Sequence, residues 1–284
     1  MKKRGKRKMG FALEVIGLLI LVVIIYLNVP YSRLKGNFKD YLVESEKNTN
    51  ASKKSSKYTL ENLPQAIQNF YSYTGLMNME MSHHVSFDFK DADFVNIDMK
   101  KTLKIDYSEH IFADLPARFA FIDSSVFGVP FQGLDSFIHG EGGMKGVIAK
   151  NITLFNQRGE EMDKAALVTW LAEIIFMPSQ VLNGDVQFKE IDKNTVDVSI
   201  SYDNLNVSGV YKFLDSGELV EFITDDRAIT YNGGRVEYRK WSALFEDYVN
   251  KDGLQLPNRL KSKWHFDTED IIYFDGSNIE YKFY

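Results

Sequence analysis

The residues of this sequence best suited to metal chemistry are its five histidines, two of which are adjacent. His83 and His84 fall in a predicted strand, where neighbouring side chains point to opposite faces, so one ion cannot easily be bound by both. His110, His139 and His265 lie at scattered positions that lack the spacing of metal ligands. The sequence therefore predicts no metal site and no cofactor.

A second candidate for chemistry is the run Asp225, Asp226 and Arg227, because two carboxylates buried together can separate their pKa values and act as acid and base. The run lies beside a predicted turn, which favours solvated loop charges. The segment from Gly140 to Gly146 lacks the Lys-Ser/Thr of a phosphate-binding loop and is typical of a turn or bulge. The sequence has no cysteine and no Gly-x-Ser-x-Gly motif, and we predict that the protein is not an enzyme.

The stretch from Met1 to Val29 sets the expected location of the chain. Six basic residues among the first eight precede a largely apolar run of nineteen positions, Phe11 to Val29. As a helix with a rise of about 1.5 Å per residue, this run is about 28 Å long, close to the hydrocarbon core of a bilayer. Because basic flanks stay in the cytoplasm, we expect a single-pass cell-membrane protein with a cytoplasmic N-terminus and an extracytoplasmic body. The alternative is a cleaved signal peptide, but no small-x-small cleavage site follows.

Composition limits what the body can bind. The whole chain has a net charge of −5, and beyond its first eight residues 28 basic residues face 39 acidic ones, a balance of −11. This negative charge disfavours nucleic acid and anionic lipid headgroups as partners of the body. Without cysteine, the body can contain no disulfide and depends on its core for stability.

Three regions are expected along the chain. Residues 1–29 are the basic start and the transmembrane anchor, and residues 30–60 are interpreted as a polar stalk or linker. Residues 61–284 form a single extracytoplasmic domain rich in β-structure, within the usual size of one core. Part of the stalk, from Leu34 to Glu46, could continue as a helix, because four apolar residues recur there at helical spacing. They are Leu34, Phe38, Tyr41 and Leu42.

Hydrophobic periodicity predicts the fold of the body. A helix over Leu63 to Gly75 carries one apolar stripe, and another starts with Asp163 as its N-cap and ends before Pro178. Elsewhere apolar and polar residues alternate between short turns, while Val126 to Gly133 is too rich in glycine and proline for regular pairing. The pattern indicates an α+β fold, mostly antiparallel β: a curved sheet or half-barrel packed with two or three helices, plus one N-terminal transmembrane helix.

Six segments together resemble an uncharacterised bacterial family known only as a domain of unknown function. They are LPQAIQNFYSYTG, WLAEIIFMPSQVL, VSGVYKFLDSGELVEF, WSALFEDY, LQLPNRLKSKW and IEYKFY, and the resemblance covers about Leu63 to Tyr284. The order of elements is also distantly similar to the lipoprotein-carrier (LolA/LolB-like) half-barrels, in which a strongly curved antiparallel sheet wraps helices and can shelter an acyl chain. This second resemblance implies a hydrophobic ligand, and neither implies catalytic residues.

We therefore expect a membrane-anchored extracytoplasmic binding module for a lipid or another hydrophobic ligand. A cell-envelope scaffold that binds envelope proteins without a small-molecule ligand is the second hypothesis, and an enzyme centred on the Asp225 to Arg227 run is the third. If the sheet and helices enclose a ligand cavity, six aromatic residues are predicted to line it, the alternative for each being an ordinary closed core. They are Phe87, Phe89, Phe119, Phe121, Trp170 and Phe176.

Overall fold

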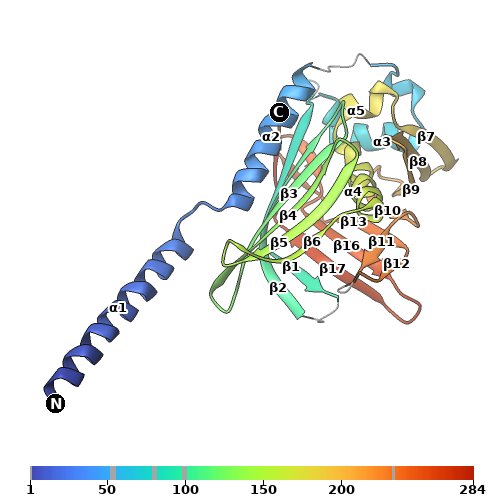
Figure 1. Cartoon of the computed structure of the whole chain (residues 1–284). Coiled ribbons are helices and arrows are strands. Elements are labelled where there is room, and N and C mark those ends of the chain that lie inside the picture. The colour runs from blue at the N-terminus through green and yellow to red at the C-terminus, as the bar shows by residue number, and fades with distance from the viewer. Residues whose placement is uncertain (1, 52–55, 79–81, 98–100, 232–233) are drawn as a thin grey trace.

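The body of the protein is one curved antiparallel sheet (Figure 1), seen in a computed structural model that describes residues 2–51, 56–78, 82–97, 101–231 and 234–284. The 14-stranded sheet has the order β6-β5-β4-β3-β2-β1-β17-β16-β13-β10-β9-β8-β7, and β18 also pairs with β1. Two short hairpins, β11–β12 and β14–β15, lie outside it. The strands are β1 (His84–Asn96), β2 (Lys101–Phe112), β3 (Ala117–Val126), β4 (Val129–Ile138), β5 (Glu141–Ile148), β6 (Ile152–Gln157), β7 (Gln187–Asp192), β8 (Thr195–Tyr202), β9 (Leu205–Phe213), β10 (Leu219–Thr224), β11 (Ala228–Thr230), β12 (Val236–Tyr238), β13 (Trp241–Glu246), β14 (Val249–Lys251), β15 (Leu254–Leu256), β16 (Arg259–His265), β17 (Asp270–Ser277) and β18 (Glu280–Phe283).

Alternating side chains explain why these segments form strands with one buried face. In β8, Val196, Val198 and Ile200 are buried, and the residues between them are partly exposed. A strand places every second side chain on the same face, so this pattern covers the core on one side and meets water on the other. The prediction of a curved, mostly antiparallel sheet with a few helices and one long apolar N-terminal helix is confirmed.

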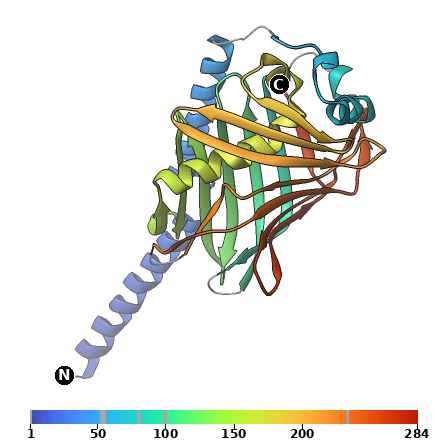
Figure 2. The same cartoon turned by 90° about the vertical axis from the view of Figure 1, so that its right-hand side faces the viewer.

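Three helices pack against the sheet: α4 (Glu160–Glu173) crosses within its curve (Figure 2), and α3 (Gln65–Thr74) and α5 (Pro178–Asn183) lie at one end of it. The helix α3 ends, as predicted, at Gly75, whose φ of +75° suits the left-handed conformation of a C-terminal cap. The predicted cap of α4 is wrong: its N-cap is Gly159, and Asp163 lies within the first turns. The Asp163 carboxylate instead accepts a hydrogen bond of 2.6 Å from the backbone N–H of Gly142.

The helix α4 is enclosed by the two arms of the sheet. Every residue from Ala165 to Glu173 is buried, because α4 contacts β5 on one arm and β9 on the other. After the short 3₁₀ turn Ile174–Phe176, α5 continues the buried segment. Other 3₁₀ turns lie at Leu60–Asn62 and Leu76–Asn78. The main core therefore surrounds α4.

Part of the segment interpreted as a polar stalk forms a second long helix, α2 (Arg33–Ala51), on the outer face of the sheet. It contacts β2, β3 and β4, and its Leu34 and Phe38 are buried against Phe119 and Phe121. The predicted helical spacing of this segment is thus confirmed. Its polar composition reflects the opposite face of α2, which is exposed to water.

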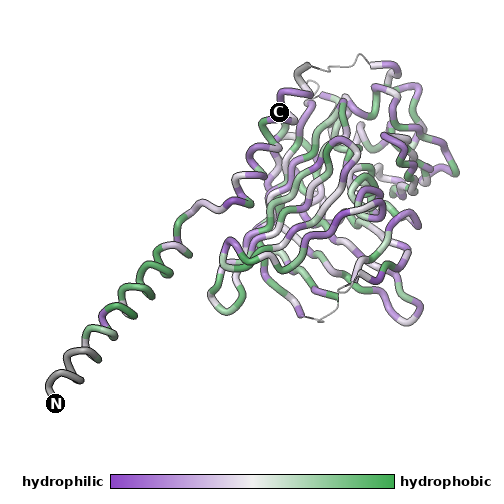
Figure 3. The backbone as a smooth tube through the Cα atoms, viewed as in Figure 1, coloured by the Kyte–Doolittle hydropathy of each residue, from purple (hydrophilic) through white to green (hydrophobic). Residues whose placement is uncertain are grey.

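The first helix, α1 (Lys2–Asn28), projects away from the body and is apolar along most of its length (Figure 3). None of its most apolar 18-residue window is buried against the rest of the chain. By length and composition, α1 is able to cross a membrane. A helix of this kind near the N-terminus fits either a membrane anchor or a signal sequence.

The segment from Val126 to Gly133 was expected to be irregular, and the structure corrects this. Here β3 and β4 form a tight hairpin in which Val126 pairs directly with Val129. Phe127 and Gly128 make the two-residue turn, with φ angles of +52° and +78°. Positive φ at both positions matches the twist of the flanking strands, so the glycine permits regular pairing.

Candidate functional site

A cavity of about 120 Å³ lies between α4 and the sheet. Its wall comes from β1 to β5 on one side, from β13, β16 and β17 on the other, and from α4. An engineered protein cavity of similar size, about 150 Å³, holds benzene, so this one can take a small group or one segment of a larger molecule. The aromatic part of the wall consists of Phe89, Phe94, Tyr107, Trp241, Phe245, Tyr273 and Phe274.

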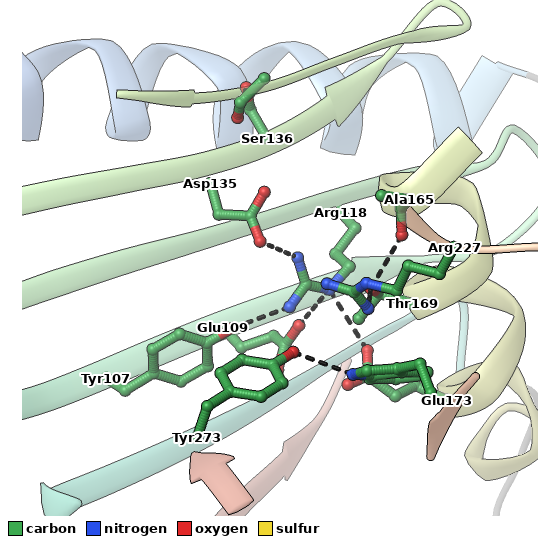
Figure 4. Close-up of polar contacts among 12 residues, drawn as sticks. Tyr107, Glu109, Arg118, Asp135, Ser136, Ala165, Thr169, Glu173, Arg227 and Tyr273 are labelled. Atoms are coloured by element: carbon green, nitrogen blue, oxygen red, sulfur yellow. Dashed lines mark hydrogen bonds and ion pairs between the residues drawn. The ribbon is translucent and has the colours of Figure 1, made fainter. Parts of the chain in front are cut away.

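One side of the cavity carries a buried charge cluster centred on Arg118 of β3 (Figure 4). The Arg118 guanidinium forms ion pairs with Glu109 of β2, with Asp135 of β4 at 2.7 Å and with Glu173 of α4 at 3.3 Å. It also donates a hydrogen bond of 2.7 Å to the Tyr107 hydroxyl. Only 3% of the Arg118 side chain is exposed, so the cluster joins three strands to α4 in a place where water screens little.

The cluster contains three carboxyl groups and one cation, Arg118, and burial shifts the pKa values of two of these carboxyl groups. Burial raises the pKa of Glu109 and raises that of Glu173 well above its usual range, with the neighbouring Glu109 carboxylate as the second cause for Glu173. Burial therefore disfavours the charged forms of both glutamates, while attraction to Arg118 favours them.

A second guanidinium, that of Arg227, reaches the cavity from the segment after β10. Its Cζ lies 4.2 Å from the ring centroid of Trp241 and 5.7 Å from that of Trp264, a cation–π arrangement. Its Nη1 donates to the Thr169 hydroxyl of α4 at 2.5 Å. Within the described parts of the chain, Arg227 has no carboxylate partner, and its buried Nε has no hydrogen-bond acceptor.

Comparison with known proteins places this fold in a family. A model of the DUF6544 family, described as a family of unknown function, matches residues 53–276. The chain belongs to the DUF6544 family. The predicted membership of a family of unknown function is thereby confirmed. No curated protein matched the DUF6544 chain.

Three solved structures are similar to this DUF6544 protein at low identity. A domain from Vibrio parahaemolyticus assigned to outer membrane lipoprotein sorting has 9% identity and a TM-score of 0.42, with 79% of this chain and 93% of that chain covered. A LolA superfamily protein from Nitrosomonas europaea has 10% identity and a TM-score of 0.34, covering 76% and 91%. A DUF1329 family protein from Desulfovibrio piger has 10% identity and a TM-score of 0.35, covering 77% and 94%. Scores of this size carry no inference about a ligand.

Four of the six aromatic residues predicted to line a cavity lie on the inner side of the sheet. Phe89 lines the cavity itself. Phe87, Trp170 and Phe176 are fully buried in the main core of the DUF6544 domain. The Trp170 indole donates a hydrogen bond of 2.9 Å to the backbone carbonyl of Phe112, which satisfies its polar atom in the core.

The other two, Phe119 and Phe121, lie on the outer face of β3 beneath α2. Because side chains alternate along a strand, Arg118 and Ile122 of the same strand face the cavity. The structure therefore separates Phe119 and Phe121 from the cavity by the thickness of the sheet.

The adjacent histidines have separate partners, and only His84 belongs to β1, since His83 lies just before that strand. His83 pairs with Asp114 at 2.7 Å, and His84 forms a hydrogen bond of 2.8 Å with His110. Burial, and then the neighbouring His110, lower the pKa of His84 to about 3, and burial lowers that of His110 to about 4. The two remaining histidines contact separate carboxylates. Among the described residues, no group of three potential ligands could hold a metal ion.

The Asp225 to Arg227 run separates in space. Asp225 is exposed, and the Asp226 carboxylate accepts hydrogen bonds of 2.7 Å and 2.8 Å from the backbone N–H and hydroxyl of Ser208. Of the three, Arg227 alone contributes to the cavity wall. The site therefore contains the cation of this run without its carboxylates.

Sequence reasoning missed the Arg118 cluster. Its members come from four elements that no spacing rule connects, but each carries a local signal. Arg118 and Glu173 are charged residues within apolar runs, ARFAFI and WLAEIIF, where a side chain facing water would break the apolar pattern. A charge in such a position indicates a buried partner.

Proposed function

We propose that this DUF6544 protein is a membrane-anchored extracytoplasmic module that binds a small hydrophobic ligand, such as a lipid, between α4 and the curved sheet. The observation that carries the proposal is the cavity, whose wall combines a concentration of aromatic rings with a few fixed polar groups. This mixture is typical of ligand sites, in which apolar walls provide affinity and polar groups set orientation.

The anchoring part of the proposal rests on α1. Its apolar side chains are exposed along the helix, which is unfavourable in water and suitable in a bilayer. Six basic residues in the first eight support a cytoplasmic N-terminus, and with that orientation the body would lie on the opposite side of the membrane. Such a tether would keep the cavity close to one bilayer and would favour local binding over transport between membranes.

The size of the cavity limits how a lipid would bind. At about 120 Å³ it holds a ligand segment of roughly benzene size, much less than a whole acyl chain. A longer chain would enter only if α4 moved away from the sheet. The proposal therefore includes a ligand-dependent displacement of α4. The chain has no cysteine, so no disulfide bond would hold α4 in place.

Native mass spectrometry of the full chain, extracted from the membrane in which it is made, tests the proposal. We expect a bound small molecule on the wild type and its loss from Ala243→Phe, because Ala243 is a buried residue of the cavity wall. Ile191→Phe places a phenylalanine at an exposed site on β7 and should keep the molecule. Circular dichroism verifies that both variants fold. A wild type without any small molecule would contradict the proposal and favour a scaffold.

A further inference from the structure

The Arg227 guanidinium has one face and one nitrogen in contact with other residues, and its Nε–Nη2 edge is open in the sense that no described residue is recorded as accepting a hydrogen bond from it. The Trp241 ring covers its face at 4.2 Å, and Nη1 donates to the Thr169 hydroxyl at 2.5 Å. The remaining edge is formed by Nε and Nη2, and the Nε atom is buried without an acceptor among the described residues. A buried donor without a partner is costly, and the Nε–Nη2 edge is one of the two forks by which arginine binds a carboxylate or phosphate through two parallel hydrogen bonds.

The acidic groups of the cavity do not neutralise Arg227. All three carboxyl residues in the wall, Glu109, Asp135 and Glu173, form ion pairs with Arg118. Burial also raises the pKa values of Glu109 and Glu173, which disfavours their charged forms. Arg227 is therefore a cavity cation that forms no ion pair with a described carboxylate of the wall.

We propose that Arg227 is an anion receptor, and that the ligand is an amphiphile whose carboxylate or phosphate pairs with the open Nε–Nη2 edge while its apolar part packs on the aromatic wall. This inference rests on the proposed function and names the chemistry of its ligand. The geometry agrees with the size of the cavity, because one anionic group and a short apolar segment fill a space of about 120 Å³.

Three soluble probes with the same six-carbon chain test the charge requirement: hexanoate, hexyl phosphate and 1-hexanol. Binding to the full chain in detergent at pH 7 is followed by calorimetry and by the fluorescence of the tryptophans. For the wild type we expect at least one of the two anions to bind roughly tenfold or more tightly than hexanol, as charge-assisted bidentate hydrogen bonds predict. The preferred anion distinguishes a carboxylate ligand from a phosphate ligand.

Two variants assign the preference to Arg227. Arg227→Met should bind all three probes with similar affinity, and Arg227→Lys, which keeps the charge without the fork, should retain a smaller preference. Hexanol binding by Arg227→Met shows that its cavity is intact. If the wild type binds hexanol as tightly as both anions, or if Arg227→Met still prefers an anion, the proposal that Arg227 is an anion receptor is wrong. The proposed hydrophobic binding site is retained in that case. If no probe binds, the proposed function fails as well.

A separate surface carries a second inference, at the end of the sheet next to α1. Phe127, at the tip of the β3–β4 hairpin, is 98% exposed and has a φ of +52°, unusual for a bulky side chain. Ile152 and Leu154 on nearby β6 are 61% and 55% exposed. The backbone N–H of Ala149 donates to the Pro130 carbonyl at 2.8 Å, which holds the β5–β6 turn beside this hairpin.

The same turn contacts the C-terminal end of α1 (Figure 1). The Lys150 ammonium donates to the backbone carbonyls of Tyr26, at 2.9 Å, and of Val29. The Asn151 amide donates to the Tyr26 hydroxyl at 2.5 Å. If α1 spans a membrane, these contacts fix the apolar tip at the level where the span ends, with a tyrosine and a lysine at the boundary, as is common at bilayer interfaces.

We infer that the Phe127 tip inserts into the lipid interface beside α1 and docks the body on the membrane. The inference rests on the proposed anchoring by α1. It accounts for the presence of a phenylalanine in a type of turn that usually contains Asn-Gly or Asp-Gly. It also accounts for the exposure of the Phe127 side chain, which is almost uncovered by the described chain.

Spin labels in the full chain, reconstituted in lipid nanodiscs, test this docking. The chain has no cysteine, so Phe127→Cys, Leu19→Cys and Ile191→Cys each give one labelling site, at the tip, in α1 and on the exposed β7. We expect labels at 127 and 19 to be accessible to oxygen and shielded from a water-soluble nickel complex, and the label at 191 to behave oppositely. If the label at 127 behaves like the label at 191 while the label at 19 reports lipid, the inferred docking of the Phe127 tip is wrong and the proposed anchoring by α1 is retained. If 19 also reports water, both are wrong.

Discussion

Replacing Arg118 by methionine is expected to destabilise the fold by about 3–5 kcal/mol, the usual cost of removing one partner from a buried ion pair. The carboxyl groups of Glu109, Asp135 and Glu173 would stay in place without their cation. Burial raises the pKa of Glu109, and attraction to Arg118 partly opposes that rise. Loss of Arg118 therefore raises the folded-state pKa of Glu109 further above its unfolded value. A carboxyl group whose pKa is raised in the folded state stabilises the fold at low pH, and this stabilisation is lost as the pH rises. The destabilisation caused by Arg118→Met should therefore be smaller at pH 5 than at pH 8.

Denaturant unfolding of the full chain in detergent, followed by near-ultraviolet circular dichroism at both pH values, measures this effect. The matched control is Arg259→Met, because Arg259 also pairs with one carboxylate, Asp275, through two hydrogen bonds of 2.8 Å and 2.7 Å. That pair is partly exposed, and its loss should cost about 1 kcal/mol or less. Equal losses in the two variants would show that burial does not strengthen the Arg118 cluster.

The alternation of residues in β3 could be predicted from the sequence, but the orientation of that strand could not. Apolar and charged residues mix in ARFAFI, and a rule that places aromatic rings inside and arginine outside puts Phe119 and Phe121 in the core. The structure reverses the faces because α2 covers the outer side of β3 and buries both rings there. Only the position of α2, which comes from a polar-looking segment, determines which face is inside.

For the cavity, too, the features that depend on local sequence could be predicted, and those that depend on contacts between distant strands could not. The identities of strands and helices follow from periodicity, and the alternating aromatic strands and the likeness to lipoprotein carriers suggested a ligand site. The Arg118 cluster and the Arg227 receptor depend on which strands become neighbours across a 14-stranded sheet, and a single sequence contains no signal for that pairing. The Asp225 to Arg227 run was recognised for its carboxylates, whereas the structure uses its arginine.

Changing Gly142 to alanine is expected to destabilise the domain by about 3 kcal/mol, the upper end of the range for overpacking. A Cβ at this position would lie 2.3 Å from the backbone oxygen of Met162 and 2.9 Å from the Cα of Asp163 in α4. Backbone atoms cannot rotate away as a side chain can, so α4 would have to move off β5. The helix carries Thr169 and Glu173 into the cavity, and its displacement should also weaken binding of the six-carbon probes.

The neighbouring strand β4 offers a matched control in Gly133→Ala. A Cβ there would meet only the side chain of Ile122, at 3.0 Å and beyond, and a side chain can adjust by a few tenths of an ångström. Both glycines have ordinary φ angles, so the comparison isolates the close approach of α4 to β5 from backbone strain. A similar loss in thermal unfolding for the two variants would mean that α4 is not held tightly against β5. Such a loose α4 would favour ligand entry between the helix and that arm of the sheet.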